Sequence, residues 1–259
     1  MRVIRAERDF MRIIIGNEEE IAKKAAQQYV ELLKRKPNAV LGGATGSTPI
    51  GLYKELAKLN KEGKISFKDV KTFNLDEYVG LDGSHDQSYR YFMNHNLFDH
   101  IDIDKANTHV PDGVNLESAK AYDAAIEDAG GIDLQILGIG VDGHIGFDEP
   151  GTALDSITHV VDLEENTREV NSRFFNSIDE VPTQAVSMGI KSIMNARSVI
   201  LMAIGESKAE IVKKMIEGPI DIMVPASILQ LHPDVTVYLD EKAASMLSGK
   251  NAAYIKFVK

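Results

Sequence analysis

Residues 132–140 read IDLQILGIG, a continuous apolar run that ends in glycine. A run of this kind is typical of a strand that is buried on both faces of a parallel sheet. The run SVILMAIG at residues 198–205 has the same character. Shorter apolar runs predict further strands at residues 11–16, 38–44, 70–75 and 234–240.

Helical stretches separate these runs. Asn17 followed by Glu20 is the pattern of a capping box, and Pro37 ends the helix that follows. Alternation of strands and helices over the whole chain predicts an α/β fold with an open, mostly parallel, Rossmann-like sheet in three α/β/α layers. No linker or repeat interrupts this pattern, so we expect residues 1–259 to form one domain. Residues 1–10 are expected to be an N-terminal extension, because MRVI at the start is echoed by MRII from Met11.

The composition narrows the class of protein. The net charge of -10 argues against nucleic acid or an anionic membrane as the main partner, although a local site could still bind an anion. The chain has no cysteine, which excludes disulfides and thiolate chemistry. No apolar run approaches 20 residues and the charged start is unlike a signal peptide, so we expect a cytoplasmic protein.

Ligands of open α/β sheets bind beyond the carboxyl ends of the strands, so the loops there carry the chemistry. The first such loop is GGATGSTP, residues 42–49. Its glycines, the hydroxyls and amides of Thr45, Gly46, Ser47 and Thr48, and the start of a helix could hold a phosphate. The loop lacks the P-loop ending and the dinucleotide spacing, and a plain tight turn remains the alternative.

The second loop, FNLDEYVGL at residues 73–81, carries two adjacent acids directly after an apolar strand. Asp76 or Glu77 could be a catalytic base. The alternative is that these acids cap a helix or lie in a solvated turn.

The third loop, GVDGHIGFDEPG at residues 140–151, places His144 between Asp142 and Glu149. A carboxylate that accepts the imidazole proton fixes the tautomer, which suits a proton shuttle near neutral pH because a free imidazole titrates at about 6.5. A divalent metal is a weaker interpretation, since no second histidine lies at ligand spacing. A structural histidine in a turn is the third possibility.

Two basic residues could complete an anion site. Arg173 lies in NSRFF, and Lys208 lies in the first turn after the strand that ends at Gly205. A lysine there opposes the helix dipole, so helix propensity does not explain it, whereas a shared anion would. For Arg173 the alternative is a surface ion pair.

Several motifs together resemble one known family. The chain is similar to glucosamine-6-phosphate deaminases from residue 11 to about residue 244, and the Asp-Gly-His element is shared with the related 6-phosphogluconolactonases. The motifs that carry the resemblance are LGGATGSTP (41–49), FNLDEYVGL (73–81), GIGVDGHIGFDEPG (138–151), NSRFF (171–175), SKAE (207–210) and ILQLHPDVTV (228–237).

The resemblance implies an enzyme of amino-sugar catabolism that converts D-glucosamine 6-phosphate and water to D-fructose 6-phosphate and ammonia. It implies no cofactor and no metal. Asp76 would be the base at the C1–C2 centre, and His144 would open the sugar ring with Asp142 and Glu149 tuning and orienting it. The phosphate would be held by Thr45, Gly46, Ser47, Thr48, Arg173 and Lys208.

The sequence also departs from the family pattern. Many members have asparagine where this chain has Asp148, so the pH optimum is an open question. His159 and Val161 stand where members activated by N-acetylglucosamine 6-phosphate carry basic residues, and the chain ends soon after the last expected strand. We therefore expect a deaminase without that activation. The competing hypotheses are a lactone hydrolase and a sugar-phosphate sensor, and a homo-oligomer remains possible.

Overall fold

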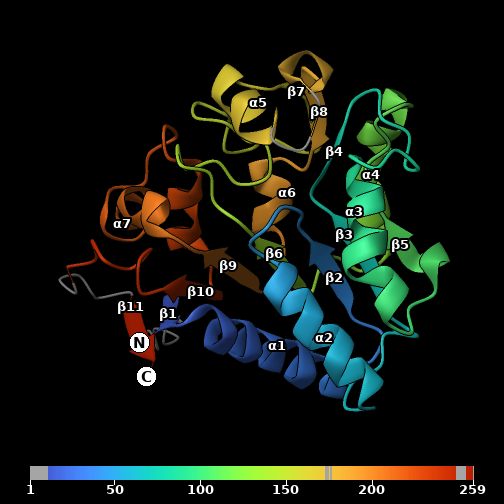
Figure 1. Ribbon diagram of the computed structural model, residues 1–259, viewed down its shortest axis with the longest axis horizontal. Helices are drawn as coiled ribbons and strands as arrows, with labels where there is room; N and C mark the ends of the chain where they lie inside the picture. The colour runs from blue at the N-terminus through green and yellow to red at the C-terminus, as the bar shows by residue number, and fades with distance from the viewer. Residues whose placement is uncertain (1–10, 173–174, 176, 249–254, 259) are drawn as a thin grey trace, which may run out of the picture.

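Two sheets organise the protein, whose computed structural model describes residues 11–172, 175, 177–248 and 255–258 (Figure 1). The larger sheet has the strand order β11-β1-β10-β9-β6-β2-β3-β5, and all its pairs are parallel. Its strands are β1 (Met11–Gly16), β2 (Val40–Gly43), β3 (Lys71–Asn74), β5 (Thr108–His109), β6 (Leu134–Leu137), β9 (Val199–Ala203), β10 (Val235–Asp240) and β11 (Ile255–Val258). The smaller, antiparallel sheet has the order β4-β8-β7, with β4 (Asp76–Tyr78), β7 (His159–Asp162) and β8 (Gln184–Ser187).

Helices cover both faces of the large sheet, which confirms the predicted three-layer α/β/α architecture. Helices α1, α2 and α3 lie side by side on one face, and α4, α6 and α7 lie on the other (Figure 1). The helices are α1 (Glu18–Arg35), α2 (Ile50–Lys61), α3 (Tyr89–Asn96), α4 (Ala119–Asp128), α5 (Glu165–Asn171), α6 (Ile190–Met194) and α7 (Ala209–Glu217). Strands β6 and β9, which carry the two longest apolar runs, are buried along their whole length between these layers.

The start of α1 shows how local sequence sets an element. The Asn17 side chain accepts a hydrogen bond from the Glu20 amide, and the Glu20 carboxylate accepts one from the Asn17 amide, both at 3.0 Å. The predicted capping box is therefore confirmed. The helix ends at Arg35, before Pro37, and its apolar residues face the sheet.

The order of the strands identifies where a ligand would bind. The chain leaves β2 toward β3 and β5 on one side, and it leaves β6 toward β9 and β10 on the other. Because β2 and β6 are neighbours, the direction of winding reverses between them. A crevice forms beyond the carboxyl ends of the strands at such a reversal.

The small sheet was not expected from the sequence. Its strands have three or four residues each, and none shows the apolar alternation that marks a longer strand. The chain passes directly from β3 into β4, so residues 76–78 form a strand in place of the expected loop. The expected N-terminal extension, residues 1–10, lies outside the described residues. Within the part of the chain that is described, no helix combines the length and apolar character needed to cross a bilayer.

Candidate active site

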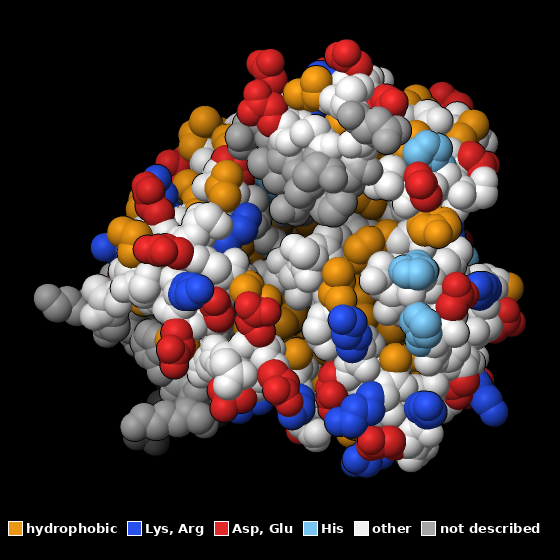
Figure 2. Space-filling view, viewed as in Figure 1, with side chains coloured by type: hydrophobic (Ala, Val, Ile, Leu, Met, Phe, Trp, Pro, Cys, Tyr) orange, Lys and Arg blue, Asp and Glu red, His pale blue; other side chains and the backbone are white. Residues whose placement is uncertain are grey.

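The candidate residues follow four neighbouring strands of the large sheet. Lys208 comes after β9, His144 after β6, the glycine-rich loop after β2, and Asp76 after β3. These loops all lie at the carboxyl edge, on both sides of the β2–β6 reversal. Figure 2 shows a hollow near the middle of the face that lies over these central strands. The shared edge predicted from the sequence is therefore present.

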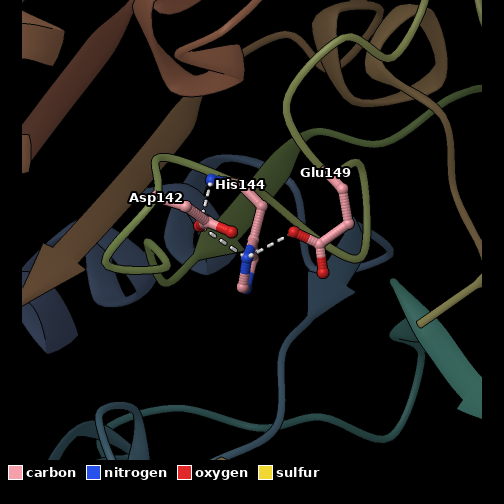
Figure 3. A group of neighbouring side chains, drawn as sticks. All are labelled: Asp142, His144 and Glu149. Carbon is pink, nitrogen blue, oxygen red and sulfur yellow. Dashed lines mark hydrogen bonds and ion pairs between the residues drawn. The ribbon is translucent and has the colours of Figure 1, made fainter. Parts of the chain in front are cut away.

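His144 lies between two carboxylates (Figure 3). Its Nδ1 is 2.8 Å from Asp142 Oδ1 and 3.3 Å from Glu149 Oε2. Both acids face Nδ1, which makes Nε2 the ring nitrogen available to a ligand. A side chain at Gly140 would prevent this arrangement, since a Cβ there would lie 2.3 Å from Nδ1.

The charge state of His144 differs from the one expected. Burial by itself lowers the pKa of His144, but the contacts with Asp142 and Glu149 outweigh burial and raise it to about 9. From the sequence we expected a histidine poised near neutrality, with Asp142 and Glu149 tuning and orienting it. In this structure the ring is an imidazolium at pH 7, so it first acts as an acid.

Glu149 has a second partner that the sequence did not reveal. The Thr167 hydroxyl, on α5, donates a hydrogen bond of 2.7 Å to Glu149 Oε1. Both side chains are buried. Thr167 fixes the Glu149 carboxylate so that its other oxygen faces His144. The two residues are 18 positions apart, and no motif links them.

Asp76 and Glu77, which the sequence could not distinguish, have different surroundings. The Glu77 carboxylate accepts hydrogen bonds from the amides of Tyr78, Tyr89 and Arg90, at 2.9, 2.9 and 3.0 Å, and so anchors the start of α3. Asp76 Oδ1 is buried without a hydrogen-bond partner among the described residues. Burial, with a smaller effect from the Glu77 charge, raises the pKa of Asp76 to about 7, although His144 acts in the opposite direction. Glu77 caps the start of α3, whereas Asp76 has a carboxyl oxygen that no described residue uses.

Asp148 lies in the loop after β6 and has no exposed surface. Neither of its carboxyl oxygens has a partner of good hydrogen-bond geometry in the described chain. Burial and the charge of Asp76 raise the pKa of Asp148 to about 8, while His144 and the nearby Ser156 hydroxyl lower it.

The glycine-rich loop presents unused polar groups. Gly46 has a φ of 88°, and a Cβ placed on it would have no atom within 4 Å, so the loop turns sharply in open space. Thr45, Ser47 and Thr48 are at least partly exposed, and within the described residues no hydrogen bond is made by their hydroxyls. The loop leads into α2, whose first turn carries no acid. These features suit an anion.

The two basic candidates have different outcomes. The Lys208 ammonium donates a hydrogen bond of 2.7 Å to the Ile139 carbonyl, which brings it from β9 to the end of β6. Lys208 lies in a 3₁₀ turn, residues Glu206–Lys208, that precedes α7, so the helix starts later than the sequence indicated. Arg173 lies outside the described residues.

A metal ion is the alternative use of the His144 cluster. One ligand atom each of Asp142, His144 and Glu149 lies within 4.8 Å of the others, which is close enough for a divalent cation. However, the imidazole nitrogen that faces both acids is the one that carries a proton at neutral pH, whereas a metal ligand must be unprotonated. The donor set therefore fits a shared proton better than an ion.

Comparisons with known proteins identify the family. The family model for glucosamine-6-phosphate isomerases and 6-phosphogluconolactonases matches residues 17–238. A glucosamine-6-phosphate deaminase of Clostridium perfringens is 56% identical over 241 residues, which cover 92% of this chain and all of the relative. A solved monomeric glucosamine-6-phosphate deaminase is 44% identical with a TM-score of 0.89, covering 91% of this chain and all of the other. The 6-phosphogluconolactonase of Thermotoga maritima shares the fold at 22% identity and a TM-score of 0.71, covering 88% of this chain and 99% of the other.

Proposed function

The chain belongs to the family of glucosamine-6-phosphate isomerases and 6-phosphogluconolactonases, and we propose how its residues carry out the activity named for its similar relatives. That activity is glucosamine-6-phosphate deamination: D-glucosamine 6-phosphate and water give D-fructose 6-phosphate and ammonia. The loop after β2 offers hydroxyls that no described residue uses, whereas the loops after β3 and β6 carry acids and a histidine, which supports a division into phosphate binding and proton transfer.

The phosphate end of the sugar binds at the glycine-rich loop in this proposal. Backbone amides at the start of α2, together with the hydroxyls of Thr45, Ser47 and Thr48, donate hydrogen bonds to phosphate oxygens. Gly46 lets the backbone approach the anion, and Lys208 and Arg173 supply positive charge. The phosphate takes no part in bond changes, so its binding energy serves to position C1 and C2.

His144 opens the ring. The imidazolium donates its Nε2 proton to the ring oxygen, and the resulting neutral imidazole accepts the proton of the C1 hydroxyl. The C1–ring oxygen bond breaks and an aldehyde forms, with no net change in protonation. Asp142 and Glu149 hold the ring through Nδ1 and stabilise its charged form before and after the step.

Asp76 then moves the proton that makes the aldose a ketose. The ionised carboxylate takes the proton from C2, which gives an enolamine, and returns a proton at C1. Water adds at C2 of the resulting iminium, and ammonia leaves. A base with a pKa of about 7 is strong enough for this task and is still about half ionised at neutral pH.

One observation carries this assignment: Asp76 is a buried acid with an unpartnered oxygen, while its neighbour Glu77 is fully engaged with amides. The test is to incubate the protein with D-glucosamine 6-phosphate and to assay ammonia and fructose 6-phosphate. We expect stoichiometric release of both. Release of neither would contradict the proposal.

Lactone hydrolysis is the competing reaction within the family. A lactonase needs a histidine that activates water but no base for a C2 proton, so the buried, unpartnered Asp76 favours the deaminase. Parallel assays with 6-phosphogluconolactone distinguish the two reactions. A higher kcat/KM for the lactone than for the amino sugar phosphate would favour the lactonase.

The substrate also bears on location and assembly. A phosphorylated sugar carries charge that prevents passage through a bilayer, which supports the expected cytoplasmic location. The solved relative at 44% identity is monomeric, whereas a homo-oligomer remained possible from the sequence. Light scattering on the purified protein decides between a monomer and an oligomer.

A further inference from the structure

Asp76 and Asp148 differ from the other acids around the site in what surrounds their oxygens. Asp142 faces His144 Nδ1, Glu149 accepts a hydrogen bond from Thr167 and forms an ion pair with His144, and Glu77 is held by amides. Asp76 Oδ1 and both oxygens of Asp148 are buried, and no donor of good geometry reaches them from the described residues. A buried carboxylate without partners is costly, and it avoids that cost by keeping a proton.

Ser187 connects the two acids. Asp76 on β4 is paired in register with Ser187 on β8. The Ser187 hydroxyl accepts a hydrogen bond of 3.0 Å from the Phe147 amide, next to Asp148 in the chain. A Cβ on Gly146 would lie 3.0 Å from Ser187 Oγ and 3.9 Å from Asp148 Oδ2, so the Asp148 carboxyl lies on the same side as that hydroxyl. The Asp76 and Asp148 carboxyls are therefore both buried in the neighbourhood of Ser187, close enough for the charge of Asp76 to act on Asp148.

The other titratable groups around the pair do not neutralise it. His144 supplies one positive charge, which is already engaged with Asp142 and Glu149. Glu77 adds negative charge, and Lys208 reaches a backbone carbonyl at the far side of β6. The remaining titratable groups that respond to the Asp76 charge are phenols on the neighbouring helices, Tyr53, Tyr89 and Tyr122.

We propose that Asp148 is a positioning residue for Asp76: the two buried carboxyls hold one proton between them, so Asp148 stays a neutral acid while Asp76 is the ionised base. The second ionisation then ends activity on the alkaline side, because another buried anion opposes the negative charge that develops at C1–C2 when the C2 proton leaves. The proposal rests on the deaminase mechanism for its kinetic consequences. The shared proton itself does not depend on that mechanism.

The ionisations of Asp76 and Asp148 set the lower and upper limits of the pH range in which the enzyme is expected to be active. The pKa of Asp76 is raised to about 7, that of Asp148 to about 8 and that of His144 to about 9. In the wild type the alkaline limit of kcat/KM is therefore set near pH 8 by the acid pair, before His144 loses its proton. An asparagine at position 148 has the shape of the neutral acid but cannot ionise.

The test is the pH profile of kcat/KM for Asp148→Asn against the wild type. We expect the alkaline limb to move upward by about one pH unit, to the limit set by His144, while the acidic limb near pH 7 stays in place. Asp133→Asn is the matched control, because Asp133 is also buried but is paired with Lys36 and Arg197 far from the site. Superimposable profiles for Asp148→Asn and the wild type would overturn the proposal.

Melting temperatures give a second readout that needs no activity. The pKa of Asp148 is raised from 3.8 to about 8 on folding, so the folded state binds more protons than the unfolded state between these pH values. Ionisation of Asp148 therefore destabilises the wild type as pH rises through that window, and Asp148→Asn lacks this contribution. We expect the melting temperature of Asp148→Asn minus that of the wild type to increase from about pH 4 to about pH 8. A difference that is constant with pH contradicts a buried neutral acid.

Infrared spectroscopy of the wild type covers the case in which Asp148→Asn does not fold. A protonated carboxyl band should be present at pH 7 and should disappear as pH rises through about 8. The absence of this band at pH 7 would overturn the shared proton even if the chain releases ammonia. Its presence in a chain that releases no ammonia would leave the shared proton standing and reject the deaminase mechanism.

Discussion

The two ends of strand β6 hold buried aspartates in opposite situations. Asp133, just before the strand, accepts a 2.8 Å hydrogen bond from the Val40 amide and pairs with Lys36 and Arg197 at 2.8 and 3.1 Å. Asp148, in the loop beyond the other end, has no such partner among the described residues. At the amino edge of the sheet a buried acid ties strands together, whereas at the carboxyl edge Asp76 and Asp148 lack such partners among the described residues. Unpaired buried acids have the shifted pKa values that proton transfer needs. The difference therefore indicates a structural role for Asp133 and a role in proton transfer for the acids at the carboxyl edge.

The largest effect is expected at Asp76. Asp76→Asn removes the base but keeps the shape of the side chain, so kcat for ammonia release should fall by about 10²–10⁴-fold. Glu77→Gln is the matched control at the next position. It should keep kcat within a few-fold while lowering the melting temperature, because it weakens hydrogen bonds to three amides. Equal losses of kcat in the two variants would contradict the assignment of Asp76 as the base and Glu77 as a helix cap.

The amino edge should respond in stability and not in chemistry. Asp133→Asn removes the charge that Lys36 and Arg197 face, so the free energy of unfolding should decrease by about 2 kcal/mol. Denaturant titration measures this change, and kcat at saturating substrate should remain that of the wild type. A decrease in kcat of Asp133→Asn without a loss of stability would show that the amino edge of the sheet also contributes to catalysis.

The glycine-rich loop should respond in substrate affinity. Ser47→Ala removes one hydroxyl from the proposed phosphate site, and a hydrogen bond to a charged group is worth about 1.5–3 kcal/mol. KM should therefore increase by about tenfold or more with kcat nearly unchanged. The control is Ser66→Ala, which lies outside the loops of the site and bonds to Asp102. A fall in kcat at constant KM would place Ser47 in the chemical step.

The smallest effect on kinetics is expected from adding N-acetylglucosamine 6-phosphate, the activator of some members of the family. His159 and Val161 lie on β7 of the small sheet, and the family resemblance implies basic residues at these positions in activated members. Addition of N-acetylglucosamine 6-phosphate should leave the half-saturating substrate concentration unchanged. A clear decrease in that concentration would show that activation does not require those basic residues.

The large sheet could be predicted because its signals are local. The apolar run before Gly138, the capping box at Asn17 and the glycine-rich loop each identify an element from adjacent residues. The family resemblance then brought Asp76, Asp142, His144 and Glu149 together, and the structure gathers them at one edge. Only the roles of those residues stay predictions.

The rest depends on contacts between distant residues. Thr167 reaches Glu149 across 18 positions, and Ser187 reaches the Phe147 amide across 40. Strands as short as β4 have no periodic pattern, so the small sheet that buries Asp76 left no trace in the sequence. Burial raises the pKa values of Asp76 and Asp148, whereas for His144 the contacts with Asp142 and Glu149 outweigh burial, and the balance of these effects emerged only from the structure.

The central claim, that one fixed carboxylate carries a proton between C2 and C1, can be tested by stereochemistry. The measurement is nuclear magnetic resonance of fructose 6-phosphate formed in heavy water, repeated with substrate deuterated at C2 in ordinary water. We predict that the incoming hydrogen isotope occupies a single one of the two C1 positions in both experiments. Equal labelling of both C1 positions would contradict the account.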